Sequence, residues 1–508
     1  MSLDGSLSIA ASGLRNINRH LAVVAQNVAN VGTPGYAREI LPQSSVTADG
    51  QGMGVRTAVA RRQIDLHMQQ AALQQGSTVA GLDVHSAGLA SIDVVHGTIG
   101  AGADLSRLVG QLEDSFTALA ADPASQPRQA AVVAAAGTLA AQVNALADAY
   151  GAGRQSAQDT VVTDVARLNA TLAQIGSLSE RIIQVRAMGQ SSADLENQRD
   201  AARGELAKLV DVRAMETPSG DLLLATNSGL SLPTRFTTAP FAVQAATLDA
   251  SSYYPGGGAP AVTLSGTDVT TRLGAGRINA NLALRDTALP MFQGELDEFA
   301  ITLARRFDAQ GLRLFSDPAG AVPPGGGTPV QAGYVGFAGT IGVNPEIAAN
   351  AALVRDGTHA VVDDPAGPSG FDPNPGNGPA GFATLVQRVL GFSFGNAVRA
   401  GVAQIASERA GLGPAGTLSA PYTPPAGLAG LATALVSAQT RASSASGVAL
   451  DSARALQTAL DAKLASGSAV SVDREMTVML QLQSAYAANA RVISAVQAMM
   501  DQTLQMLR

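Results

Sequence analysis

The chain has 508 residues, a formal net charge of −7 and 46% hydrophobic residues, with no cysteine and no tryptophan. This length predicts more than one domain, and the apolar fraction is large enough to bury substantial cores. Without cysteine the chain has no disulfide and no thiolate metal site. The acidic balance and the scattered arginines argue against a nucleic-acid partner.

No signal or membrane segment is expected. The first five residues lack a basic region followed by an apolar core, which argues against a secretory signal. The most apolar stretch, 130–141, is shorter than the roughly 20 residues that a membrane span needs. It is therefore expected to form a buried helix rich in alanine, and no membrane insertion is expected.

Apolar residues near the start of the chain recur at alternating spacings of three and four. Asparagine, glutamine and arginine occupy the other faces, and glycine and proline at 32–35 end the pattern. This predicts an amphipathic helix with a coiled-coil seam. A helix lying on a membrane is the alternative, but such helices usually carry a Lys/Arg-rich polar face and bulky aromatic residues. The seam residues are Leu7, Ala10, Leu14, Ile17, Leu21, Val24, Val28 and Val31.

The end of the chain repeats this pattern. Ser471 can cap the helix, and Asp473 and Glu475 lie in the first turn, where the helix dipole favours negative charge. Two seams without obvious partners predict that the terminal helices pair with each other or with another subunit. The second seam contains Val472, Met476, Met479, Gln483, Tyr486, Ala490, Ile493, Gln497, Met500, Leu504 and Leu507.

Further helices are expected between the ends. The pattern is helical over 76–150, with a break at 122–127, and again over 161–188 and 194–209. A β-hairpin is expected at 212–226, and short strands and turns over 230–275. Helices are then expected at about 286–310, 384–410 and 427–465, and glycine and proline dominate 314–380.

Motifs for chemistry are scarce. The five histidines form no ligand pair at helical spacing, and we expect no metal site. The segment 274–276 lacks the third glycine of a dinucleotide-binding loop, and neither lysine follows a glycine as in a phosphate-binding loop. We therefore expect no cofactor and no catalytic residue. The histidines are His20, His67, His85, His96 and His359.

Two segments near the start resemble the signature of flagellar rod, hook and hook-associated proteins. These are 11–14, Ala-Ser-Gly-Leu, and 26–38, which runs Gln-Asn-Val-Ala-Asn-Val-Gly-Thr-Pro-Gly-Tyr-Ala-Arg. In the family a helix ends in Ala-Asn-x-x-Thr-x-Gly-Tyr-x-Arg, and Gly32 stands where asparagine is usual. The signature residues are Asn27, Asn30, Thr33, Gly35, Tyr36 and Arg38.

Other segments resemble the hook-associated branch of this family, whose members join hook to filament. They are 121–130, 194–200 with Glu205-Leu206, 273–297, 341–345 and 470–476. In 194–200, Glu196-Asn197 replaces the usual Leu-Asp. In 470–476, Ser471 and Arg474 depart from the family's Val-Asn-Leu-Asp-Glu-Glu-Met.

The resemblance implies a mainly α fold, in which long terminal helices form a coiled coil and a helical rod domain carries an attached β-rich part. Seven segments are expected. They are a helix and signature loop (1–70), the front of the rod domain ending in a β-hairpin (71–230), a β-rich part (231–275), a rod helix (276–313), a Gly/Pro-rich loop or reduced outer insertion (314–380), the rear of the rod domain (381–470) and the C-terminal helix (471–508).

The resemblance also implies a function. The chain is expected to be a secreted structural subunit of the bacterial flagellum that forms the hook–filament junction and is required for filament assembly. The implied partners are copies of itself, the hook protein, the second junction protein, filament proteins and an export chaperone at the C-terminal helix. A rod or hook subunit is one alternative. A secreted wall-active enzyme with acids at Asp356, Asp363, Asp364 and Asp372 is another.

Overall fold

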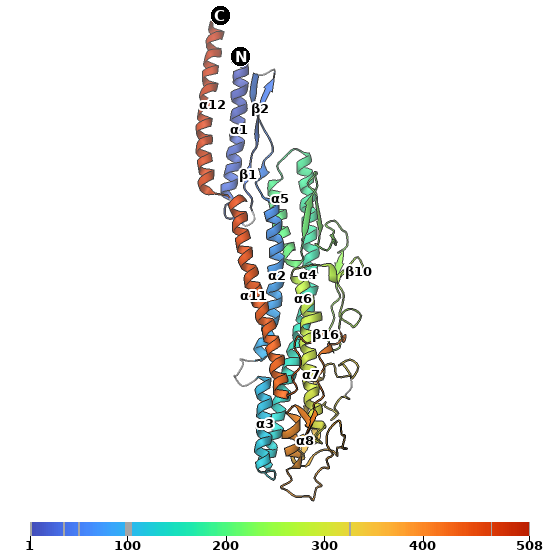
Figure 1. The fold of residues 1–508 in the computed structure, drawn as a ribbon. Coiled ribbons are helices and arrows are strands. Elements are labelled where there is room, and N and C mark those ends of the chain that lie inside the picture. Colours follow the sequence, from blue (N-terminus) through green and yellow to red (C-terminus); the bar gives the residue numbers. More distant parts are fainter. Residues whose placement is uncertain are drawn as a thin grey trace.

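The computed structural model describes residues 3–33, 36–48, 51–96, 104–324, 327–468 and 470–506. The molecule is elongated and mainly helical, and both chain ends lie at the same end of it (Figure 1). The long helices run roughly along its length, and short strands lie along one side. The expected fold class, mainly α with long terminal helices and a β-rich part, is confirmed.

The two ends of the chain form one unit. Helix α1 (Leu3–Ala29) lies beside α12 (Val472–Met506), as Figure 1 shows. A hairpin of β2 (Gln43–Ala48) and β3 (Gln51–Thr57) packs on α1. We call residues 3–62 and 472–506 the terminal module. The sequence pattern did not indicate this hairpin, nor the short pairing of β1 (Glu39–Ile40) with β4 (Arg61–Arg62).

The remaining helices build a rod. It contains α2 (Leu66–His96), α3 (Leu105–Ala121), α4 (Gln126–Ala187), α5 (Ala193–Leu209), α6 (Arg277–Ala283), α7 (Leu289–Asp308) and α11 (Leu428–Ser468). With 62 residues, α4 is about 93 Å long and links two separate cores. Leu139 of α4 lies in the core shared with α3, α7 and α11, and Leu168 lies in the core shared with α5 and α6.

Helix α4 also corrects one expectation from the sequence. The apolar stretch of this helix is longer than 130–141, and by length and composition alone it could cross a membrane. Its apolar side chains are instead explained by packing, since Val132, Leu139, Val143 and Leu146 are fully buried in the protein. One third of the apolar window is buried, and these buried residues belong to the core of the rod.

The β structure is a set of small sheets. Strands β5 (Arg213–Glu216), β6 (Leu222–Ala225) and β7 (Ser231–Leu232) form one antiparallel sheet, with Arg213 opposite Ala225. Strands β8 (Phe241–Ala242), β9 (Thr263–Leu264) and β10 (Thr267–Asp268) form another. These sheets contribute to the core that α4 and α5 share, through the buried side chains of Leu222, Leu224 and Phe241.

The segment 314–380 is loop-rich, but its apolar residues belong to the core of the rod. Tyr334, Phe337, Ile347 and Val354 are buried against α4 and α7. The segment contains five short elements, which are β11 (Phe315–Ser316), the 3-10 helix η3 (Phe337–Gly339), β12 (Gly342–Val343), α8 (Pro345–Ala349) and α9 (Leu353–Asp356). The segment therefore completes the rod domain in this structure.

The helix expected at 384–410 is wrong beyond its first turns. Helix α10 (Thr384–Arg388) continues as the π-turn η4 (Val389–Ser393), and two hairpins follow. Gly401 and Gly411 have φ angles of +82° and +74°, which a helix cannot accommodate. The hairpins pair β13 (Ala397–Arg399) with β14 (Val402–Ala403) and β15 (Ala410–Leu412) with β16 (Leu418–Ser419). The remaining short helices are the 3-10 helix η1 (Thr270–Arg272) and the π-helix η2 (Leu284–Ala288), which joins α6 to α7.

Candidate functional site

Helix α1 contacts a different partner on each side at residues 12 and 13. The Ser12 hydroxyl accepts a hydrogen bond from the Val55 N–H at 3.3 Å, which fixes strand β3 on the helix. Gly54 has a φ of +126°, and a Cβ there would lie 2.5 Å from Ser12 Oγ. On the other side, a Cβ on Gly13 would lie 3.0 Å from Asn489 Oδ1 of α12. Small residues therefore allow both close approaches.

Most predicted seam residues of α1 are at least partly covered by the elements packed around this helix, which are α12, β1 and β3. Ile17 and Val24 are buried, while Leu7, Leu14, Leu21 and Val28 are half-buried. On this helix the spacing of three and four places the apolar side chains toward neighbouring elements.

The predicted seam of α12 is only partly covered. Met479, Ile493 and Met500 are half-buried, but Met476, Tyr486 and Leu504 remain 45%, 41% and 65% exposed. The fully buried residues of α12 are Glu475 and Val496, which the seam did not include. Apolar side chains therefore extend around α12 beyond the face that α1 covers, and this leaves an apolar strip exposed on the single chain.

Asn27 organises the signature segment. Its Oδ1 accepts hydrogen bonds from the Glu39 N–H at 2.9 Å and from the Tyr36 hydroxyl at 3.1 Å. Its Nδ2 donates to the Glu39 carbonyl at 2.9 Å. The buried amide thus pairs with the backbone of residue 39 as a neighbouring strand would, and it turns the chain back along α1.

Arg38 and Glu475 connect the two ends of the chain. The Arg38 guanidinium donates to Glu475 Oε1 at 2.5 Å, and Asn27 Nδ2 lies 3.4 Å from Glu475 Oε2. The Glu475 side chain is completely buried in the first turn of α12. A carboxylate there is favoured by the helix dipole, but in this burial it also needs a cationic partner. We call Asn27, Tyr36, Arg38 and Glu475 the clasp.

The remaining signature residues end helix α1. Thr33 Oγ1 donates to Asn30 Oδ1 at 3.1 Å, and Asn30 Nδ2 donates to the Gln26 carbonyl at 3.0 Å. The Asn30 side chain thus links Thr33 to the last turn of the helix, where the Gln26 carbonyl also accepts from the Asn30 backbone N–H at 3.1 Å. Gly35 lies outside the described residues.

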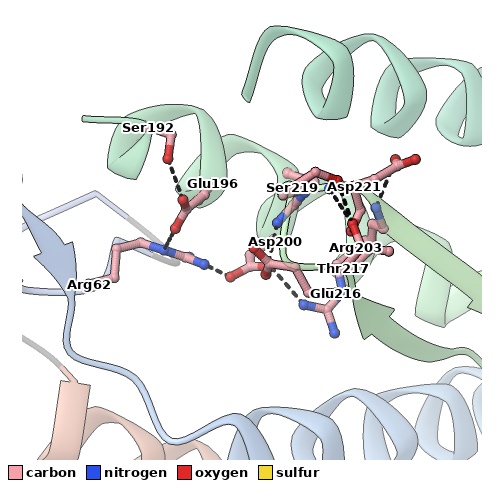
Figure 2. Close-up of polar contacts among 12 residues, drawn as sticks. Arg62, Ser192, Glu196, Asp200, Arg203, Glu216, Thr217, Ser219 and Asp221 are labelled. Atoms are coloured by element: carbon pink, nitrogen blue, oxygen red, sulfur yellow. Dashed lines mark hydrogen bonds and ion pairs between the residues drawn. The ribbon is translucent and has the colours of Figure 1, made fainter. Parts of the chain in front are cut away.

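Helix α5 holds the terminal module on the rod through Arg62. Figure 2 shows the Arg62 guanidinium between two carboxylates of α5, Glu196 at 2.8 Å and Asp200 at 2.5 Å. The neighbouring Asn197 accepts from the Ala37 N–H at 3.3 Å. Burial alone would raise the pKa of Asp200, but the Arg62 and Arg203 guanidiniums hold this pKa below its usual value.

These contacts give a physical role to two segments that the sequence identified only by resemblance. The segment 194–200 supplies the carboxylates that bind Arg62, and 470–476 supplies the buried Glu475. The sequence itself offers one signal for these contacts. Glu196 and Asp200 are four residues apart and therefore lie on one face of α5.

No group that could hold a metal ion is found among the described residues. Of the acids considered for a wall-active enzyme, Asp356 ends helix α9, and Asp363, Asp364 and Asp372 lie in irregular segments. Asp356 pairs with Arg355 and accepts from Asn374, while Asp363 and Asp364 accept backbone N–H groups of residues 370 and 366. Asp363 is also paired with Arg399.

Comparisons with known proteins agree with this architecture. Residues 89–318 match the family model of the flagellar hook-associated protein FlgK helical domain, and residues 464–506 match that of the flagellar basal body rod FlgEFG protein C-terminal. Both matched segments are thus similar to parts of flagellar axial proteins. Within that class, the helical segment of this chain is of the FlgK type.

Individual relatives are distant. The chain is 23% identical to flagellar hook-associated protein 1 of Bacillus subtilis over 222 residues, 41% of this chain and 43% of that protein. It is 25% identical to the Salmonella typhimurium protein of the same name over 330 residues, 61% and 56% of the two chains. It thus spans about half the length of the curated relatives it matches. The solved structure of the flagellar hook junction protein FlgK from Burkholderia pseudomallei has 22% identity, a TM-score of 0.39 and coverage of 50% and 45%.

Proposed function

We propose that this chain is a structural subunit of the junction between hook and filament in the bacterial flagellum, and that it polymerises through the terminal module. The observation that carries the proposal is the clasp, which joins the flagellar signature near the start of the chain to the first turn of α12. It holds two apolar helices parallel to the long axis of an elongated molecule.

The exposed part of α12 supports assembly through this module. Met476, Tyr486 and Leu504 lie along one helix and leave apolar surface in water. Exposed apolar side chains of this size are costly in water, and covering them with a neighbouring copy removes them from it. The low charge of the whole chain, 14%, fits a subunit that is largely covered in an assembly.

The proposed partners follow from the family. They are further copies in a ring or helix, the hook protein on one side, and the second junction protein with the filament on the other. The proposed location is outside the cell, after export through the flagellar secretion channel without a cleaved signal. A cytoplasmic chaperone would cover the apolar face of α12 before export. Truncation after Val470 should then abolish chaperone binding and leave the rod folded.

Two other functions are less well supported. A rod or hook subunit shares the signature and the C-terminal match, but the FlgK-type helical domain over 89–318 favours the junction. A wall-active enzyme would need paired carboxylates in a cleft, and the acids of 314–380 instead accept hydrogen bonds from turns. The proposal includes no enzymatic activity. Hydrolysis of peptidoglycan by the purified chain would contradict it.

A deletion strain tests the proposal directly. Cells that lack the gene should form hooks without filaments and release flagellin into the medium. Complementation with the parent chain should restore filaments. Hooks that fail to form at all would favour a rod or hook subunit, whereas normal filaments in the deletion strain would contradict the proposal.

A further inference from the structure

Strands β5 and β6 place two apolar side chains on the outer face of their sheet. Met215 and Leu223 lie directly opposite each other across the strands, and they are 66% and 55% exposed. The neighbouring pair, Ala214 and Leu224, faces the core that α4 and α5 share. Arg213 lies on the outer face with Met215, because side chains two residues apart in a strand share a face. We call Arg213, Met215 and Leu223 the sheet face.

Helix α11 carries a similar combination of side chains on its outer side. Val448 and Leu456 are 67% and 51% exposed and lie about two turns apart. Asp451 is three residues from Val448, so these two side chains are neighbours on the helix surface. The nearby Arg454 is already paired with Asp83 of α2 at 2.6 Å. We call Val448, Asp451 and Leu456 the α11 face.

The two faces carry charges of opposite sign. Arg213 and Asp451 are both exposed, and neither forms an ion pair or a side-chain hydrogen bond with any other residue that the structure describes. Each charge lies beside an apolar side chain, so Met215 can cover Val448 while Arg213 reaches Asp451. Charge pairs of this kind fix the register of an interface and exclude wrong partners more than they add affinity.

The sheet face and the α11 face lie on opposite sides of the rod. Helix α11 packs on α2, α2 packs on α5, and the sheet covers the core of α4 and α5. Figure 1 shows α11 and the green strands that follow α5 on opposite sides of α2. Gln457 of α11 lines a cavity together with Lys208, which lies just before β5, so the two faces are at the same level of the rod. One chain cannot join these faces, but two parallel copies side by side can.

We propose that neighbouring copies of this chain contact each other through their rods, with the sheet face of one copy on the α11 face of the next and Arg213 paired with Asp451. A contact between two different faces of one chain repeats from copy to copy, so it builds a ring or a helix. It adds a lateral contact between rods to assembly through the terminal module. The inference rests on the proposed function, which requires a polymer of this chain.

Cross-linking between copies tests this contact, because the chain has no cysteine of its own. One variant carries Met215→Cys and the other carries Val448→Cys, and the purified full-length chains are mixed at high concentration and oxidised with diamide. A disulfide forms only where two Cα atoms come within about 7 Å of each other. The mixture should give a covalent dimer, whereas each variant alone should stay monomeric. Met215→Cys mixed with Thr117→Cys, at an exposed position of α3, measures the yield from random collision.

Reversal of the two charges tests the register of the contact. Arg213→Asp in the Met215→Cys chain should reduce the dimer to the collision yield, because two acids then face each other. Asp451→Arg in the Val448→Cys chain should restore the dimer. Thermal melting of these variants should match that of the parent, since all four positions are exposed. If Met215→Cys melts below the parent, Leu223→Cys takes its place, with the same expected outcomes.

Three results would overturn the contact or its register. A yield in the mixture no higher than the collision yield overturns the contact, and a dimer from one variant alone overturns it because equal faces then meet. Failure of Asp451→Arg to restore the dimer overturns the pairing with Arg213. Failure of the proposed function gives a different result. A cross-link without incorporation at the hook tip supports the rod contact and contradicts the junction, whereas incorporation without a cross-link contradicts only the rod contact.

Discussion

Arg38 and Glu475 are 437 residues apart in the sequence, yet their side chains form an ion pair of 2.5 Å in the terminal module. The two partners differ in burial, since Glu475 is fully buried and the Arg38 side chain is 17% exposed. Removal of one partner therefore has unequal consequences. A buried carboxylate without a cation is costly, whereas a partly exposed guanidinium can be hydrated.

The clasp should respond to mutation in this unequal way. Arg38→Met should destabilise the packing of α12 by about 3 kcal/mol, because it leaves the buried Glu475 carboxylate without a cationic partner. Glu475→Gln should cost less, and the double variant should recover part of the loss of Arg38→Met. Amide exchange along 475–500 measures this packing. Equal effects of the two single variants would show that the pair is not buried as described.

The approach of α1 to α12 at Gly13 predicts a second effect. Gly13→Ala should weaken the pairing of the two helices by roughly 1 kcal/mol relative to Gly151→Ala, because both changes favour helix but only the Cβ at residue 13 would press on Asn489. Asn489→Ala should relieve the contact and restore the pairing in the double variant. Gly151→Ala in α4 is the control, since no atom lies within 4 Å of a Cβ there. That change should be neutral or stabilising, because alanine favours helix more than glycine. Amide exchange of α12 measures the loss of pairing in Gly13→Ala and its recovery in the double variant. A Gly13→Ala chain with the exchange rates of the parent would contradict the close approach.

Buried acids on α7 predict that stability depends on pH. Glu295 is 3% exposed, and Asp297 is 1% exposed while accepting the backbone N–H groups of Gly336 and Ala338. Burial raises the pKa of each to about 7. The folded chain then binds more protons than the unfolded chain between about pH 4 and pH 7, so its stability should fall as pH rises through this range. The full shifts correspond to at most roughly 3.5 kcal/mol for Glu295 and roughly 4.5 kcal/mol for Asp297.

Thermal melting at a series of pH values tests this dependence. Glu295→Gln keeps the shape of the side chain without the charge, so it should flatten the fall in stability between about pH 4 and pH 7. Asp114→Asn, a change at an exposed acid of α3, should leave the slope as in the parent. If the stability of Glu295→Gln depends on pH as steeply as that of the parent, the Glu295 carboxyl is not the source of the pH dependence.

The sequence predicted the helical framework well because periodicity is a local property. The stripe of α1, the break at 122–127 and the hairpin after α5 all appear in the structure. The helix expected to reach residue 410 was wrong, because Gly401 and Gly411 adopt positive φ angles that the apolar pattern does not reveal. Short strands such as β13 and β15 have too few residues to show a period.

The site was harder to predict than the fold. Asn27, Tyr36 and Arg38 were identified by resemblance, but nothing local in the sequence indicates that they meet Glu475 or that Arg62 meets Glu196. Such contacts are set by the arrangement of distant helices. The predicted seam of α12 included Leu504, which is exposed, and left out Val496, which is buried, because apolar residues lie on more than one face of this helix.

The exposed strip of α12 gives the most direct test that the terminal module drives assembly. Tyr486→Asp and Leu504→Asp place a charge on side chains that are already 41% and 65% exposed in the single chain. Monomer melting should therefore stay close to that of the parent. In a polymer the same charges would be buried without a partner, at a cost of several kcal/mol each.

The decisive measurement is incorporation at the hook tip in the deletion strain, scored by labelling of isolated hooks and by filament number. Ser484→Asp, at an exposed polar position of α12, is the matched control and should assemble like the parent. Tyr486→Asp and Leu504→Asp should melt normally, fail to incorporate and leave hooks without filaments. Normal incorporation of both variants would contradict assembly through the terminal module.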